Sequence, residues 1–356
     1  MTLVRLVLTF AGVLLGATTG FAQFVSYEMV SVGDPGNTRD ANGYGRVPYE
    51  YRIGKFEVTI SEYASFLNAV AQADPYGLYS ESMTTGSHTA GIARTGSFGA
   101  YAYSLVGPFG ATQVPAATAG NRPITNVSWF DAARFANWMA NGQPVGPQGL
   151  LTTENGAYTL NGVTFGTAPS VNDVNPNTGL TPLYRIPTED EWYKSAYYKG
   201  GGLNAGYWTY ATQSDTPPGN IPGTAVNEAN YMTNGTTYSV TQSSSYVLIQ
   251  NYLTDVGAFG GSPSAYGTFD QSGNVQEWND LAGAAMNLRG IRGGFCFSGA
   301  GGLSSAYWDA WPAANEGYQG FRLSSPVAVP EPSTYAMALA GLACGGYSMW
   351  RRRKRA

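Results

Sequence analysis

Helical spacing of apolar residues is confined to three short segments, and this limits the folds open to the chain. The segments cover residues 61–70, 128–139 and 188–196, and no convincing helix follows Lys199 before the C-terminal tail. Between them lie short strand-like pieces and glycine-rich turns; the chain has 47 glycines and only 12% charged residues. Because elements this short need many connections to enclose a core, the pattern predicts a loop-rich α+β fold with little regular secondary structure.

Capping residues support two of these helices. Ser128 is followed three residues later by Asp131, and Thr188 by Glu191, so each pair can bond the free amides of a helix N-terminus. Residues 51–59 alternate loosely and predict a strand. Three further stretches are poor in charge and are predicted to be long loops: 73–120, 142–181 and 233–261.

The N-terminus has the order of a secretory signal. Arg5 precedes an apolar run over residues 6–17, and Gly20 and Ala22 are small residues of the kind that a signal peptidase reads. The run is too short for a stable membrane span. We therefore predict that residues 1–22 are a signal peptide and that the exported domain covers residues 23–326.

The C-terminal residues 327–356 have three parts in order. Pro330-Glu331-Pro332 is followed by an apolar stretch, 335–350, and then by a basic cluster, 351–355. An apolar segment closed by basic residues predicts a C-terminal membrane helix whose charged end stays in the cytoplasm. The order resembles the PEP-CTERM sorting signal of Gram-negative bacteria. That resemblance implies processing by an exosortase and a location in the cell envelope, on the outer surface or in the extracellular matrix.

Removing both ends leaves an acidic body. The whole chain has 19 Lys and Arg against 23 Asp and Glu; the ends hold six of the cations and one acid, so the body carries 13 against 22. Nucleic-acid binding depends on neutralising phosphates with cations. The charge balance therefore predicts no nucleic-acid partner.

The chain offers few groups for nucleophilic or zinc chemistry. Cys296 lies in the body and Cys344 in the tail, so the mature body can form no intrachain disulfide. Cys296, between Phe295 and Phe297, is predicted to be a small buried hydrophobe. His88 is the only histidine and is predicted to be a solvated loop residue. This argues against a His-rich zinc site or a catalytic triad.

One acidic loop, residues 269–278, has the ligand types that calcium prefers. Asp270 and Glu277 supply carboxylate oxygens, and Gly273 between them lets the backbone turn so that carbonyl groups can point inward. Hard oxygen ligands from a short, glycine-kinked loop suit Ca²⁺ better than softer metals. The alternative is a polar turn before a strand, and the loop alone leaves both interpretations open.

Four phrases occur in order along the body. They are residues 122–129 (Arg-Pro-Ile-Thr-Asn-Val-Ser-Trp), 184–192 (Tyr-Arg-Ile-Pro-Thr-Glu-Asp-Glu-Trp), 273–278 (Gly-Asn-Val-Gln-Glu-Trp), and 289–294 (Arg-Gly-Ile-Arg-Gly-Gly) with 320–322 (Gly-Phe-Arg). This series resembles the formylglycine-generating enzyme family, also called sulfatase-modifying factors, over roughly residues 51–322.

The resemblance implies a C-type-lectin-like core with structural calcium. Carried over by position, the ligands would be the side chains of Asp270 and Glu277 and the carbonyl groups of Gly273 and Val275. Asp270 stands where the family often has Asn, which keeps an oxygen ligand. A second family calcium site is faint here; Asn230 could belong to it.

The family's enzymes oxidise a sulfatase cysteine to formylglycine with O₂ and copper, which requires two closely spaced thiolates after the Gly-Gly turn. Here Gly293 and Gly294 are followed by Cys296 alone, slightly too early, while Ser298 falls near the place of the first thiolate. Soft sulfur ligands hold Cu(I), so copper is not expected. Cys296 and Ser298 are the catalytic candidates that this segment offers.

The remaining conspicuous residues have structural interpretations. No Lys or Arg occurs between Arg292 and Arg322, and we predict that these two arginines bond acids or loop carbonyls in the core. The acids of 189–191 suit a helix N-terminus rather than a carboxylate dyad. The aromatic run of 307–311 is predicted to pack in the core rather than line a ligand groove.

Two functions remain open on this sequence. The first is a calcium-stabilised binding or structural module that presents its loops to a glycan, a polysaccharide or a protein. The second is an enzyme, either an active formylglycine-generating oxidase or a catalyst of another reaction on the same fold. A resemblance in fold does not decide activity.

Overall fold

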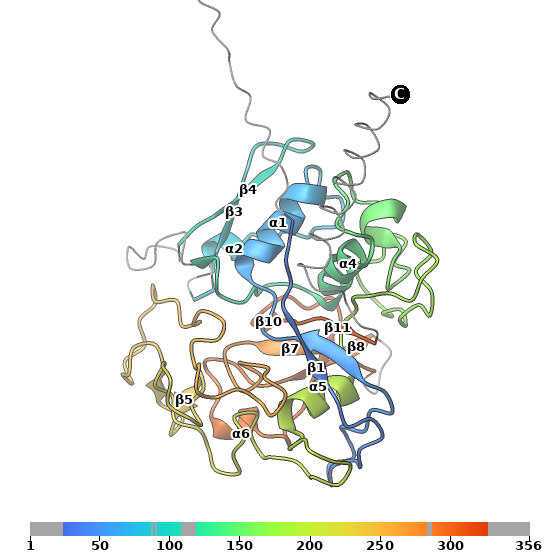
Figure 1. Ribbon diagram of the computed structural model, residues 1–356. Helices are drawn as coiled ribbons and strands as arrows, with labels where there is room; N and C mark the ends of the chain where they lie inside the picture. Colours follow the sequence, from blue (N-terminus) through green and yellow to red (C-terminus); the bar gives the residue numbers. More distant parts are fainter. Residues whose placement is uncertain (1–23, 87, 90, 108–118, 283–286, 327–356) are drawn as a thin grey trace, which may run out of the picture.

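The computed structural model of the chain describes residues 24–86, 88–89, 91–107, 119–282 and 287–326. Its helices and strands are short and joined by long irregular segments, as Figure 1 shows. The longest described helix has 12 residues and the longest strand has seven. The predicted loop-rich α+β architecture is therefore confirmed for this part of the chain.

Two sheets organise the domain. The first is antiparallel, has the order β1-β2-β11, and brings both ends of the domain together: β1 (Met29–Val32), β2 (Tyr51–Gly54) and β11 (Ser324–Ser325). The second has the order β10-β7-β8-β9, and only β10 is parallel to its neighbour: β7 (Gln276–Ala282), β8 (Leu288–Arg292), β9 (Asp309–Pro312) and β10 (Gln319–Gly320). These sheets carry the acidic loop and the arginines discussed below.

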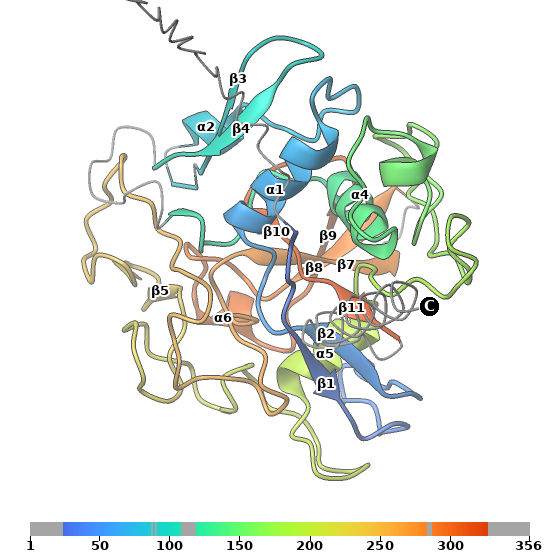
Figure 2. The same ribbon diagram turned by 45° about the horizontal axis from the view of Figure 1, so that its top comes forward.

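The three predicted helices are present with their caps. They are α1 (Ile60–Val70), α4 (Trp129–Ala140) and α5 (Glu189–Tyr197), and each begins with a reciprocal capping box. α1 and α4 lie side by side in both ribbon views (Figures 1 and 2) and share an aromatic core. The ring centroid of Phe66 lies 5.3 Å from those of both Phe135 and Trp138. Burial of such rings is the main stabilising contribution of this half of the domain.

The segments predicted as loops contain small elements that the sequence does not reveal. They are α2 (Ser82–Thr85), β3 (Ile92–Thr95), β4 (Ala102–Leu105), the π-helical turn η1 (Leu150–Glu154), β5 (Met232–Thr233) and β6 (Thr237–Tyr238). A further turn, α6 (Ala300–Leu303), follows Lys199, where no helix was expected. Elements of two to five residues are too short to show a period. The predicted strand 51–59 is also shorter and ends at Gly54.

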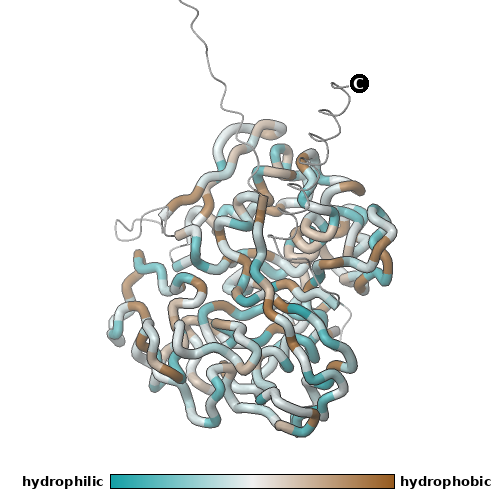
Figure 3. Tube along the Cα trace, viewed as in Figure 1, coloured by the Kyte–Doolittle hydropathy of each residue, from teal (hydrophilic) through white to brown (hydrophobic). Residues whose placement is uncertain are grey.

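Hydropathy changes over short distances along the trace (Figure 3). In the part of the chain that the structure describes, no helix combines the length and apolar character needed to cross a membrane. The predicted membrane helix, 335–350, and the predicted signal peptide, 1–22, lie outside the described residues.

Candidate functional site

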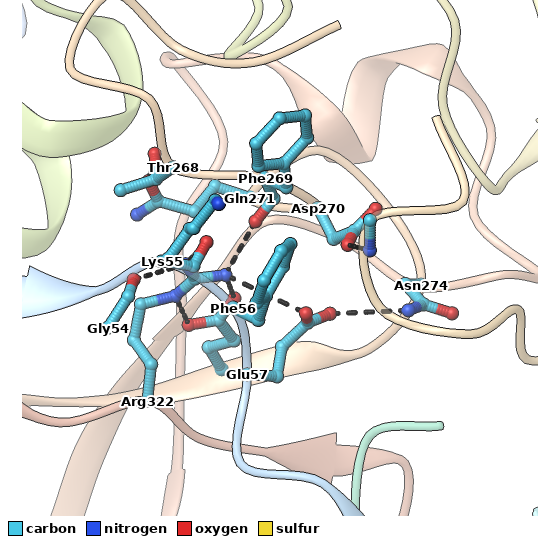
Figure 4. A network of polar contacts seen from close by, with 12 residues as sticks. Gly54, Lys55, Phe56, Glu57, Thr268, Phe269, Asp270, Gln271, Asn274 and Arg322 are labelled. Atoms are coloured by element: carbon cyan, nitrogen blue, oxygen red, sulfur yellow. Dashed lines mark hydrogen bonds and ion pairs between the residues drawn. The ribbon is translucent and has the colours of Figure 1, made fainter. Parts of the chain in front are cut away.

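The acidic loop folds against a fully buried arginine. The Arg322 Nε and Nη2 atoms donate to Oε2 and Oε1 of Glu277, both at 2.6 Å, and the indole of Trp192 donates to Oε2 at 2.8 Å. The other Arg322 donors reach the carbonyl oxygens of Gly54 and Phe269, both at 2.9 Å (Figure 4). One side chain thus joins β2, β7 and the acidic loop, which confirms the structural role predicted for Arg322.

Two further carboxylates share this arginine. Oε2 of Glu57 lies 3.9 Å from Nη2 of Arg322 and makes no hydrogen bond within the described residues, while Oε1 accepts from the Asn274 amide at 3.3 Å (Figure 4). Burial raises the pKa of Glu57 well above its usual value, and the nearby Asp270 charge raises it further. Burial also raises the pKa of Asp270 to about 6. Asp270 accepts a hydrogen bond from the amide of Gly257 at 2.6 Å, so of these three carboxylates Glu277 is the one hydrogen-bonded to the guanidinium in the described part of the chain.

The turn of the loop requires glycine at one position. Gly273 has φ +94°, and a Cβ atom there would lie 2.2 Å from the carbonyl oxygen of Asn230. The Asn230 amide donates to Oδ1 of Asn274 at 3.0 Å and to the carbonyl oxygen of Tyr252 at 2.9 Å. Asn230, a candidate ligand of a second calcium site, thus clamps the acidic loop through its side-chain nitrogen.

Of the four predicted calcium ligands, only Asp270 lies beside a cavity. That cavity has a volume of about 10 Å³, roughly what one water molecule needs, and Gly273, Val275 and Glu277 do not line it. A carboxylate has about four acceptor sites, and within the described residues Oε1 of Glu277 accepts one hydrogen bond, from Arg322. In the described residues, however, no three His, Cys, Asp or Glu side chains are grouped so that they could hold a metal alone. A cation here would depend on backbone carbonyl groups as well.

The segment after the Gly-Gly turn is packed as a core. Cys296 is 1% exposed and lies among Tyr252, Leu253 and Val275. Burial raises the pKa of its thiol, so the thiolate is disfavoured. The Ser298 hydroxyl accepts a hydrogen bond from the amide of Phe295 at 3.0 Å. The prediction that Cys296 is a buried hydrophobe is confirmed, and the Ser298 hydroxyl contacts the backbone of its own turn.

The end of this segment is also apolar. Leu303, five residues beyond Ser298, is fully buried against Tyr210, Ala229 and Tyr231. The chain's other cysteine, Cys344, lies outside the described residues, in the C-terminal tail.

Two predictions about aromatic surroundings are wrong. His88 is only 8% exposed and packs between Tyr246, Tyr252 and Phe297, because the loops that carry these residues converge on it. Conversely, Trp308 and Trp311 are 49% and 38% exposed, because they lie on and beside the edge strand β9. An aromatic run at a sheet edge cannot bury all its rings.

The acids at the start of α5 lie at the helix N-terminus as predicted, and two of them also form ion pairs with arginines. Glu189 forms a buried ion pair with Arg292, and Glu191 forms one with Arg185 at 2.6 Å. The acids therefore cap the helix and anchor arginines; none faces another as a catalytic dyad.

Sequence reasoning missed two partners of the acidic centre, Glu57 and Trp192. Glu57 had a usable signal, because it lies in an otherwise half-apolar, strand-like segment where an inward acid must find a cation. No local pattern could indicate the Trp192 contact, because Trp192 and Glu277 are 85 residues apart in the sequence.

These features define an α+β domain held together by several buried Arg–Glu pairs, of which Arg322–Glu277 joins the acidic loop to both sheets. The chain belongs to the family of the sulfatase-modifying factor enzyme 1-like domain, whose model matches residues 29–325. A PEP-CTERM protein-sorting motif matches residues 328–354. The family and the sorting signal inferred from the sequence are thereby confirmed, and the motif supports export to the cell envelope and processing by an exosortase.

Three solved structures are similar over most of the chain. CarF shares 22% identity, with 85% of this chain and 99% of that chain covered and a TM-score of 0.43. Treponema denticola variable protein 1 shares 17% identity, with 85% of this chain and 95% of that chain covered and a TM-score of 0.45. PvdO from Pseudomonas aeruginosa shares 17% identity, with 85% of this chain and 93% of that chain covered and a TM-score of 0.41. No curated protein matched.

Proposed function

We propose that this protein is an exported binding module that has the sulfatase-modifying-factor fold without its copper oxidase chemistry. The carrying observation is the segment after Gly293 and Gly294, where the single thiol of Cys296 is buried among apolar residues. With the only other cysteine in the sorting tail, the body cannot supply the two thiolates that the family's copper site uses. Its ligand would be a glycan, a polysaccharide or a protein, and the apolar stretch 335–350 would anchor it to the membrane.

An oxidase assay tests this proposal. The purified protein is incubated with a Cys-x-Pro-x-Arg peptide, copper, a reductant and air, and the peptide is followed by mass spectrometry. We expect no replacement of the thiol by an aldehyde, because no thiolate pair is available. An active family member serves as the positive control. Aldehyde formation that survives Cys296→Ala would show that the fold oxidises thiols without cysteine, and the alternative enzyme function would replace the proposal.

We further propose that calcium stabilises the acidic centre, held by the side chains of Asp270 and Glu277 and the carbonyl groups of Gly273 and Val275. The support is electrostatic: three buried carboxylates face one guanidinium, and a divalent cation would offset the excess. A ligand that binds only the folded state stabilises it, by about 2.7 kcal/mol at 100 times its Kd.

Chelation should therefore lower the thermal midpoint, and calcium should restore it. Asp270→Ala should largely remove this response, because it removes both the charge and the ligand oxygens. Asp215→Ala, at a half-exposed surface acid, is the matched control and should respond like the unmodified protein. A midpoint that does not change with chelator would exclude calcium from this site.

A further inference from the structure

An open pocket lies at the N-terminus of α5, apart from both the acidic centre and the Gly-Gly segment. Its volume is about 330 Å³, at the lower end of the roughly 300–1,000 Å³ typical of small-molecule sites. Three separate parts of the chain line it: Arg39 and Tyr44 from the β1–β2 connection, Glu189 and Asp190 from α5, and Asp280 and Leu281 from β7.

The charges of the pocket largely cancel. Glu189 is paired with Arg292, and Oδ1 of Asp280 lies 3.2 Å from Nε of Arg289. That leaves Asp190 and Arg39, which have opposite signs. A cationic ligand would find little uncompensated negative charge, and an anionic ligand would meet three carboxylates. The pocket therefore favours a neutral ligand.

Several polar groups in the pocket are available for hydrogen bonds. In the described part of the chain, the Arg39 guanidinium and the Tyr44 hydroxyl make none. Glu189 offers no such group, because its Oε1 is bonded to Arg292 and its Oε2 is buried away from the pocket opening. Asp190 uses Oδ1 to accept from the amide of Gly45 at 2.7 Å. Carboxylates accept from hydroxyl groups, so the pocket suits a ligand rich in hydroxyls.

Tyr44 adds an apolar surface with a fixed orientation. The Arg292 guanidinium carbon lies 4.9 Å from the centroid of its ring, and the ring of Tyr193 packs at 5.8 Å. A half-buried ring held in this way can support the apolar C–H face of a sugar, while Asp190 bonds its hydroxyls.

We propose that this pocket binds a neutral saccharide, with Tyr44 as the packing surface and Asp190 and Arg39 as hydrogen-bonding groups. The inference rests on the proposed binding function and deepens it, since it names both the site and the ligand class.

Binding to defined oligosaccharides tests the inference. Cellotetraose, mannotetraose and chitotetraose are the neutral probes, and tetragalacturonate and tetralysine are the charged ones, all measured against the purified full-length protein by saturation-transfer NMR and calorimetry. We expect at least one neutral probe to bind and both charged probes to bind more weakly. Absence of binding by every neutral probe, or tighter binding of tetralysine, would overturn the inference.

Variants place the binding in the pocket. Tyr44→Ala should weaken it about tenfold, and Arg39→Ala about threefold to tenfold. Arg39 is exposed and makes no described contact, so its removal should not disturb folding, which the thermal midpoint checks. Phe98→Ala removes an exposed ring on the distant β3–β4 turn and should leave binding unchanged.

The outcomes separate this inference from the proposed function. Sugar binding that survives both Tyr44→Ala and Arg39→Ala would overturn the pocket assignment while leaving a binding module. Aldehyde formation in the oxidase assay would overturn the proposed function itself. If no probe binds and no aldehyde forms, the saccharide inference alone is overturned.

Discussion

Replacing Arg322 by methionine is expected to destabilise the domain by about 3–5 kcal/mol, the cost of leaving a buried ion pair with one partner. Arg322 and Glu277 are both fully buried and share two hydrogen bonds of 2.6 Å. Without the guanidinium, Glu277 keeps a single donor among the described residues, the Trp192 indole, and Glu57 loses the cation that lies 3.9 Å from its Oε2. Urea denaturation followed by tryptophan fluorescence measures the change.

A surface pair provides the control. Glu28→Gln removes the partner of Lys55, where the acid is 62% exposed, and should change stability by less than about 1 kcal/mol. The double variant Arg322→Met, Glu277→Gln should recover part of the loss, because it removes the unpaired charge. A loss below about 1 kcal/mol for Arg322→Met alone would mean that the arginine does not hold β2, β7 and the acidic loop together.

Local patterns in the sequence predict the helices well. The starts of α4 and α5 are set by capping boxes whose two residues lie three positions apart, so the information is contained in one short window. The left-handed turn at Gly273 is also predictable from a short window, because a glycine between two acids indicates a sharp turn.

Contacts between distant segments are what local patterns cannot predict. The residues next to His88 in the sequence are polar or small and predict an exposed loop. Tyr246, 158 residues away, nevertheless packs against the His88 ring, with the ring centroids 5.2 Å apart. Trp308 and Trp311 are exposed because β9 is the last strand of its sheet. Strand order depends on the whole chain, so an aromatic run alone cannot reveal it.

The acidic centre and the Gly-Gly segment are in direct contact: the amide of Gly273 donates to the carbonyl oxygen of Gly293 at 2.8 Å, and the amide of Cys296 donates to that of Asn274 at 3.1 Å. The first keeps the buried arginine, its carboxylates and the glycine turn, all of which hold the domain together. In the second, Leu303 and Cys296 are buried among apolar side chains. The proposed binding function needs no thiolate pair, because Arg322, its carboxylate partner and backbone carbonyl groups make the contacts of the acidic centre.

Gly273→Ala is expected to cost about 3 kcal/mol or more, and it tests the acidic centre without changing any charge. A left-handed backbone costs an L-residue roughly 1–2 kcal/mol, and overpacking adds about 1–3 kcal/mol. Both costs apply here. The new Cβ would lie 2.2 Å from the carbonyl oxygen of Asn230, which is a backbone atom and not the end of a flexible side chain that could move aside.

Gly99→Ala isolates the two contributions. Gly99 has φ +87°, close to that of Gly273, but no atom lies within 4 Å of the added Cβ. Gly99→Ala should therefore lower the free energy of unfolding only by the cost of the left-handed backbone, about 1–2 kcal/mol. Equal losses for the two variants in urea denaturation would show that the acidic loop shifts away from Asn230 at no cost. A larger loss for Gly273→Ala would show that the clamp between Asn230 and the loop is rigid, so that it holds Glu277 in place against Arg322.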